Sequence, residues 1–137
     1  MSYKTLGISA ISTLAFALPV WAHHSHGYYA KETIDLVGVV TEVHLINPHS
    51  WIYMEVTDDN GQKTEWALEA HTPAALERIG ITHDYIGAGD NIKVRCHPLR
   101  DGGSDCLLGF VQARDGSIKD WDANGAMPID DGFFDIP

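Results

Sequence analysis

Residues 51–80 read WIYMEVTDDNGQKTEWALEAHTPAALERIG and carry the clearest signals of secondary structure in the chain. Its first part, residues 51–57, alternates in the way a half-buried β-strand does. The segment 58–61, Asp-Asp-Asn-Gly, is a strong signal for a tight turn. Residues 63–70 then provide a returning strand, so the centre of the chain is expected to be a β-hairpin.

A short helix is expected directly after this hairpin. Thr72 has the character of an N-cap, Pro73 suits the first helical position, and Gly80 is a stop signal. Outside the quoted stretch, three more β-rich segments are expected to form strands: residues 36–46, 91–96 and 106–112.

The first of these strands, 36–46, carries apolar residues at alternating positions, and Gly38 suggests a bend or a bulge in it. Four apolar side chains are expected to share one face: Val37, Val39, Val43 and Leu45.

Three strands, a short helix and two more strands predict a mostly β fold. The element order is that of a small five-stranded OB-like barrel with the helix between strands 3 and 4, and a small β-sandwich is the alternative. The chain divides into four expected parts: a signal peptide (1–22), a histidine-rich N-terminal arm (23–33), the OB-like β domain (34–121) and an acidic and aromatic C-terminal tail (122–137).

The first 22 residues have the pattern of a secretory signal. A short start containing Lys4 precedes the uncharged apolar run 5–18, and small or aliphatic residues end at Ala22, where cleavage is expected. An uncleaved membrane anchor is the alternative, although the run is shorter than the roughly 20 residues that cross a bilayer. The mature protein is therefore expected to be periplasmic or secreted, without stable insertion into a membrane.

The charge of the chain argues against nucleic acid as a partner. The full sequence has 9 basic and 19 acidic residues and a net charge of −10. Removal of residues 1–22 takes away Lys4, which leaves 8 basic against 19 acidic residues, or −11. Such a surface repels phosphate backbones.

Cys96 and Cys106 are the two cysteines of the sequence. In an oxidising compartment an even pair indicates a disulfide, here closing the base of a hairpin loop. The alternative is a cysteine–histidine metal pair, since His97 follows Cys96 directly.

Three of the eight histidines lie at the expected mature N-terminus: His23, His24 and His26. If cleavage follows Ala22, the α-amino group and the imidazole of His23 can chelate one metal ion, because the amino group has a reference pKa of about 8. A further imidazole would complete a nitrogen site that copper(II) accepts.

His49, in Asn-Pro-His, and His71 are the candidates for that further ligand within the β domain, with Glu69 two residues before His71. Loop 1–2 and the strand-to-helix junction can lie at one rim of an open barrel. His49, Glu69 and His71 are therefore expected to converge there. The alternative is that the histidines are solvated surface residues without a metal.

Several short motifs together resemble a family of small exported bacterial proteins of unknown function. They are His-His-Ser at 23–25, GVVTEV at 38–43, Asn-Pro-His-Ser at 47–50, WALE at 66–69 and LERIG at 76–80. The resemblance implies export and a compact β domain, and it implies no catalytic residue.

These observations lead to one main functional hypothesis, a periplasmic metal-binding protein that holds or passes an ion, with copper as the expected metal. The main alternative is a binding or adaptor module that uses a barrel face carrying Trp51 and Tyr53 to bind a small molecule or a periplasmic partner protein. A copper oxidase is a further alternative, but the sequence carries no Gly-x-Ser-x-Gly or His-Glu-x-x-His motif.

Overall fold

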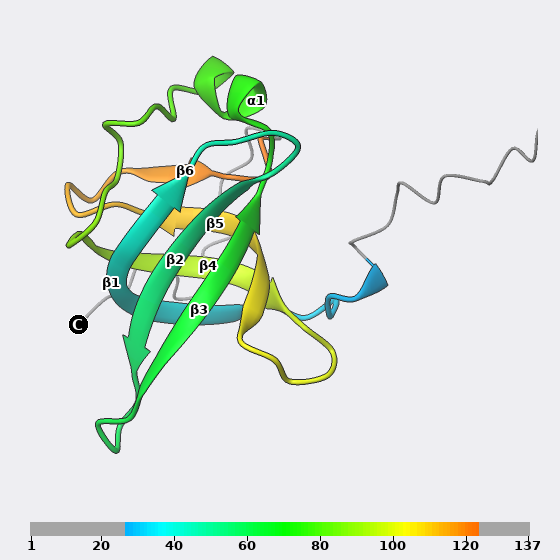
Figure 1. Ribbon diagram of the computed structural model, residues 1–137, viewed down its shortest axis with the longest axis vertical. Coiled ribbons are helices and arrows are strands. Elements are labelled where there is room, and N and C mark those ends of the chain that lie inside the picture. The colour runs from blue at the N-terminus through cyan, green and yellow to red at the C-terminus, as the bar shows by residue number, and fades with distance from the viewer. Residues whose placement is uncertain (1–26, 124–137) are drawn as a thin grey trace, which may run out of the picture.

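The computed structural model describes residues 27–123. In this part of the chain the elements follow one another as six strands and one short helix (Figure 1): β1 Ile34–His44, β2 Ser50–Thr57, β3 Lys63–Ala70, α1 Pro73–Arg78, β4 Asn91–Pro98, β5 Asp105–Gln112 and β6 Ile118–Asp120.

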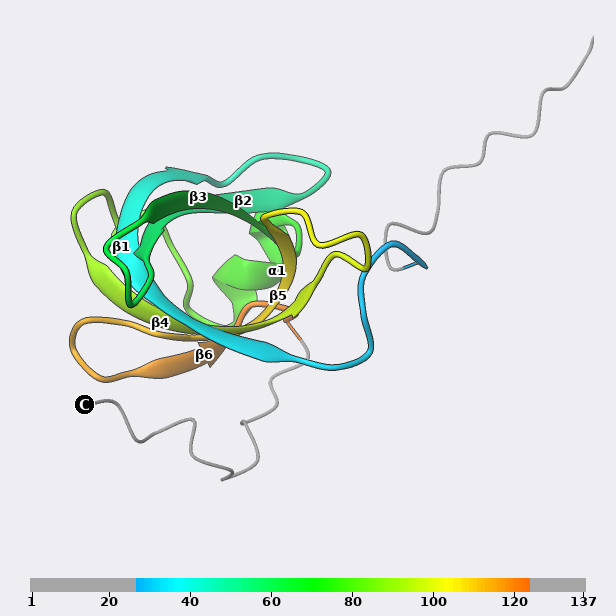
Figure 2. The same ribbon diagram turned by 90° about the horizontal axis from the view of Figure 1, so that it is seen from below.

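The first five strands form a closed barrel. β1 lies between β2 and β4 and pairs antiparallel with both, while β3 pairs with β2 and β5 pairs with β4. The ring closes because β5 also runs parallel to β3, from Ala67↔Asp105 to Glu69↔Leu107. Figure 2 looks along the barrel and shows this ring. The expected OB-like barrel is confirmed, and the pairing of β3 with β5 excludes the β-sandwich.

β1 contains a bulge, but not at Gly38. The first part of the strand pairs with β4 and the second part with β2, and the register shifts between Val40 and Glu42. An extra residue at this point bends the strand and increases its twist, which allows one strand to serve two neighbours in a barrel.

The bulge overturns the expected face of the first strand. Val37 and Val39 are 45% and 43% exposed, whereas Val40 is 1% exposed and belongs to the core. Val43 and Leu45, beyond the bulge, do pack against the core as expected. The extra residue changes the phase of the alternation, so residues before and after it cannot share one face.

Helix α1 covers one end of the barrel (Figure 1). Its start is as predicted, because Thr72 is the N-cap and accepts a hydrogen bond from the Ala75 N–H. The chain turns away at Gly80, which has a φ of +79°. Leu76 of the helix is fully buried. No helix within residues 27–123 has the length and apolar character needed to cross a membrane.

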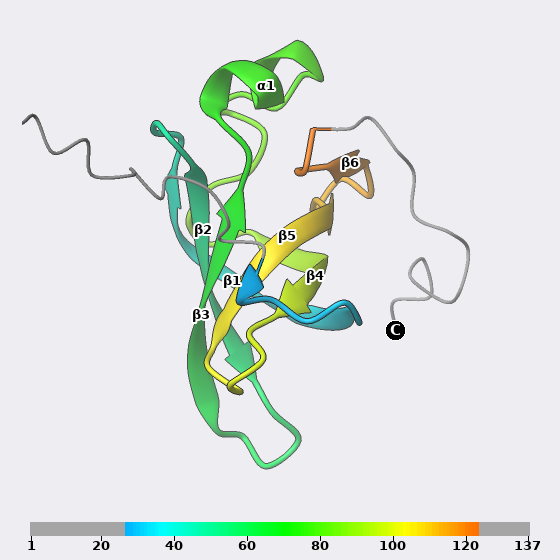
Figure 3. The ribbon, with the colours of Figure 1, turned by 90° about the vertical axis from the view of Figure 1, so that its right-hand side faces the viewer.

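A sixth strand was not predicted. The chain turns at 114–117, where the Ala113 N–H donates to the Ser117 carbonyl. After it, β6 pairs antiparallel with the end of β5, from Gln112↔Ile118 to Phe110↔Asp120. Figure 3 shows β6 beside the second half of β5. Three residues are too few for an alternation to be recognised in the sequence.

Candidate functional site

One row of side chains crosses the outer surface of the barrel from β1 to β5. Residues directly opposite one another in paired strands project to the same face. The register pairs His44 with Trp51, Trp51 with Glu69, and Glu69 with Leu107. Ile52, the neighbour of Trp51 in β2, is fully buried in the core, so the row that contains Trp51 faces outward.

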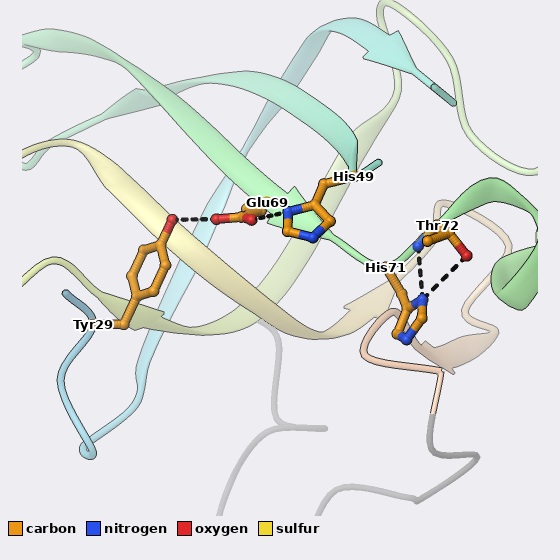
Figure 4. Close-up of polar contacts among 5 residues, drawn as sticks. All are labelled: Tyr29, His49, Glu69, His71 and Thr72. Atoms are coloured by element: carbon orange, nitrogen blue, oxygen red, sulfur yellow. Dashed lines mark hydrogen bonds and ion pairs between the residues drawn. The ribbon is translucent and has the colours of Figure 1, made fainter. Parts of the chain in front are cut away.

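Glu69 is buried although it belongs to this outer row. It is only 5% exposed. Its Oε2 accepts a 2.7 Å hydrogen bond from the phenol of Tyr29, and its Oε1 contacts Nδ1 of His49. Figure 4 shows the three side chains in a line with Glu69 in the middle. Burial of a carboxylate is costly unless partners satisfy it, and here each oxygen has one. We call Tyr29, Glu69 and His49 the Glu69 cluster.

Tyr29 reaches Glu69 because the segment before β1 is tied to the β4–β5 hairpin. The Ala30 N–H donates to the Pro98 carbonyl at 2.8 Å. Arg100 donates twice, through its backbone N–H to the Tyr28 carbonyl at 3.0 Å and through Nε to the Tyr29 carbonyl at 2.8 Å. Tyr29 is consequently 7% exposed, whereas Tyr28 is 72% exposed.

Burial raises the pKa of the Tyr29 phenol well above its ordinary value, and the hydrogen bond to Glu69 and the negative charge of Glu69 raise it further. The phenol therefore remains protonated across the neutral and mildly alkaline range and acts as a hydrogen-bond donor to Glu69.

His49 lies between β1 and β2, directly after the cis Asn47–Pro48 bond. Its side chain is 43% exposed, in contrast to 6% for that of Glu69. The ring is thus held by a buried carboxylate on one edge while much of it faces solvent. A neutral histidine that donates from Nδ1 keeps a lone pair on Nε2, which can bind a metal ion or accept a proton.

His71 lies outside the Glu69 cluster. Its Nδ1 accepts a 2.7 Å hydrogen bond from the Thr72 N–H, and the side chain points toward Thr72 rather than Glu69 (Figure 4). Of the three residues expected to converge, only His49 and Glu69 are in contact. Nowhere in residues 27–123 do three His, Cys, Asp or Glu side chains form a group that could hold a metal ion. The other three candidate ligands lie outside the described residues: His23, His24 and His26.

The expected ligand face is an aromatic surface beside the Glu69 cluster. The rings of Trp51 and Tyr53 are stacked, with centroids 6.5 Å apart and planes inclined by 21°. His44 meets Tyr53 edge to face at 5.3 Å, and its Nε2 lies 2.8 Å from a carboxylate oxygen of Glu42. Because Trp51 is directly opposite Glu69, the aromatic surface and the cluster are continuous.

The predicted disulfide between Cys96 and Cys106 is present. Both cysteines are fully buried in the core. The bond joins β4 to β5 at the base of the hairpin that holds the segment containing Tyr29. Because both sulfurs are joined in this bond, neither cysteine can form the alternative, a cysteine–histidine metal pair.

Tyr29 is the member of the site that the sequence did not reveal. It follows Tyr28 directly, and both precede the first strand. The hydrogen bond of its phenol to Glu69, which is distant in the sequence, distinguishes the buried tyrosine from the exposed one.

Three comparisons with known proteins bear on the chain as a whole. A family model described as "Family of unknown function (DUF6152)" matches residues 11–108. No curated protein shows significant similarity. Among solved structures, the chain is similar to the mitochondrial single-stranded DNA binding protein Rim1 from S. cerevisiae, with a TM-score of 0.48 and 9% sequence identity over 61% of this chain and 93% of that one.

Proposed function

The chain belongs to the family of unknown function DUF6152, and we propose that it is an exported metal-binding protein that holds or passes a copper ion. The observation that carries the proposal is the state of His49. Its ring is half-exposed, while a buried carboxylate holds one edge of it. Metal-binding histidines are commonly fixed in this way, with one ring nitrogen on a carboxylate and the other on the metal.

The N-terminal histidines supply the remaining ligands in this proposal. His23 precedes Tyr29 by six residues, and six residues span at most roughly 20 Å when extended. Since Tyr29 contacts Glu69 and Glu69 contacts His49, the length of the chain is sufficient for residues 23–26 to reach His49. One half-exposed imidazole is too few ligands for a copper site, so this contribution is essential.

The chemistry of the proposed site follows from cleavage after Ala22. The freed α-amino group and the imidazole of His23 form a chelate, and Nε2 of His49 adds a third nitrogen. Nitrogen ligands of this kind suit copper(II). His24, His26 and His71 are further candidate ligands. Export is itself part of the proposal, and the disulfide supports it because such bonds persist in oxidising compartments.

The test is a copper titration of protein matured by export, with its start at His23 verified by mass spectrometry. The proposal predicts one copper per chain at sub-micromolar affinity. Addition of one residue before His23 separates the α-amino group from the imidazole, and it should remove most of the affinity. Weak binding, or binding indifferent to the extension, would refute the copper site.

A second candidate function rests on the aromatic surface formed by Trp51, Tyr53 and His44. Stacked rings on an outer barrel face supply apolar area at little cost in side-chain entropy. In this reading the protein is a binding or adaptor module for a small molecule or a periplasmic partner. Stoichiometric capture of a partner by metal-free protein, lost on Trp51→Ala, would favour it over the copper site. Capture unaffected by Trp51→Ala would count against the aromatic surface.

A further inference from the structure

We propose that Glu69 is a positioning residue and not a metal ligand, and that Glu69 and Tyr29 together make Nε2 of His49 the atom offered to the ion. The bound ion in this inference rests on the proposed function, whereas the arrangement of the three side chains does not depend on it. It assigns roles within the Glu69 cluster that the sequence alone does not distinguish, because carboxylate and imidazole are both ordinary metal ligands.

The first argument is that each oxygen of the Glu69 carboxylate already has a partner and is buried. Oε2 accepts from Tyr29 at 2.7 Å and Oε1 contacts Nδ1 of His49. The side chain is 6% exposed, so solvent does not provide a route by which an ion reaches a free lone pair. Each oxygen keeps one further lone pair, but coordination through it would bring the ion into a buried environment, which carries a desolvation cost.

The second argument concerns which groups carry protons. A phenol has an ordinary pKa of about 10, so at neutral pH Tyr29 donates and Glu69 accepts. An ionised carboxylate accepts only, so a favourable contact with His49 requires a proton on Nδ1. When the ring is neutral, its lone pair is therefore on Nε2. Glu69 holds the Nδ1 edge of the ring, and the His49 side chain as a whole is 43% exposed.

The third argument is the place of Tyr29 in the chain. Tyr29 follows the N-terminal histidines in the sequence, and Arg100 and Pro98 hold residues 28–30 against the β4–β5 hairpin. The Tyr29–Glu69 hydrogen bond thus links the start of the described chain to the carboxylate that orients His49. Loss of the phenol hydroxyl should disturb the orientation of His49 without removal of any ligand.

The molecule contains a matched control pair. His44 and Glu42 lie on the same outer surface at 2.8 Å, but through Nε2 of the histidine and with both side chains exposed. Glu42→Gln therefore controls for Glu69→Gln, and Tyr28→Phe at an exposed position controls for Tyr29→Phe.

The first experiment needs no metal. Long-range ¹H–¹⁵N NMR of ¹⁵N-labelled, metal-free protein above the histidine titration range reports which nitrogen of each imidazole is protonated. We expect His49 to carry its proton on Nδ1. In Glu69→Gln the amide can turn either its oxygen or its NH2 group toward Nδ1, so this preference should weaken, whereas Glu42→Gln should leave His49 unchanged. A proton on Nε2 of His49 in the wild-type protein would overturn the proposal.

The second experiment is copper titration of the same proteins with the authentic N-terminus. Loss of a group that orients a ligand typically costs 10–100-fold in metal affinity. The loss of affinity in Glu69→Gln should fall within about that range, and Tyr29→Phe should lower the affinity by a smaller factor. Tyr28→Phe and Glu42→Gln should have no effect.

If Glu69 were a ligand, Tyr29→Phe would free one of its oxygens, and an unchanged or increased affinity would overturn the positioning role. Absence of copper binding in the wild-type protein would refute the proposed function, and the protonation of His49 would still decide the geometry.

Discussion

The α-carbon of Gly38 in β1 faces the backbone carbonyl of Glu55 in β2 with no room for a side chain. A Cβ at position 38 would lie 2.4 Å from the Glu55 oxygen and 2.7 Å from Cε of Met54. The obstructing oxygen belongs to backbone and cannot swing aside. Gly38→Ala should therefore lower the free energy of unfolding by about 1–3 kcal/mol, the usual cost of overpacking, as measured by urea denaturation.

Gly87 provides the control for this substitution. No heavy atom lies within 4 Å of a Cβ added there, and its backbone is not in the left-handed region. Gly87→Ala should be neutral or slightly stabilising, because alanine reduces the entropy of the unfolded chain. Equal losses for the two variants would show that the approach of Gly38 to Glu55 is not the cause.

Local signals in the sequence were sufficient for most of the barrel. The turn at 58–61 and the N-cap at Thr72 depend on residues that are close together in the chain, and both were predicted correctly. The bulge between Val40 and Glu42 was not, because it depends on β1 pairing with two different strands. The exposure of Val37 and Val39 is a direct consequence of that long-range pairing.

The candidate site shows the same division. His49 and Glu69 were recognised as chemically useful residues, and their contact depends on the register of β2 with β3. Tyr29 was missed because its burial is created by the hairpin at 99–104, some 70 residues later in the chain. Hydrogen bonds between distant segments leave no local pattern in one sequence.

The protonation of Tyr29 predicts how stability changes at alkaline pH. Its pKa in the folded protein is raised above the unfolded value of about 10. The contribution of Tyr29 to stability is therefore fully present below about pH 10 and is lost as the pH rises from there toward the folded pKa. Denaturation at a series of pH values should show a steeper alkaline loss for the wild-type protein than for Tyr29→Phe. The exposed Tyr28→Phe should behave as the wild type does, and identical slopes in all three proteins would contradict this account.

The disulfide should contribute substantially to stability because the domain is small. Both cysteines are buried and 10 residues apart in the sequence. Closure of a loop of that length lowers the entropy of the unfolded chain and so stabilises the folded protein by about 3 kcal/mol. The double variant Cys96→Ala/Cys106→Ala should unfold at correspondingly lower urea concentration. Alkylation of the wild-type protein unfolded in urea without a reductant should modify no thiol. Labelled cysteines, or equal stability of the two proteins, would show that the bond is not formed or not stabilising.

The copper proposal predicts that the histidines of the β domain differ in their contribution to copper affinity. His49 is oriented by Glu69, whereas His83 is exposed on the turn after α1. His49→Ala should weaken copper binding by at least tenfold, in line with the loss of a ligand and its oriented nitrogen. His83→Ala should leave the affinity unchanged.

His71→Ala distinguishes a site that includes His71 from one that does not. Because Nδ1 of His71 is hydrogen-bonded to the Thr72 N–H, a loss of affinity in this variant would make His71 a further ligand through Nε2. Isothermal titration of the three variants measures these affinities directly. Equal effects of His49→Ala and His83→Ala would mean that the ion binds to exposed imidazoles without selection, and the site at Glu69 would then have to serve another purpose.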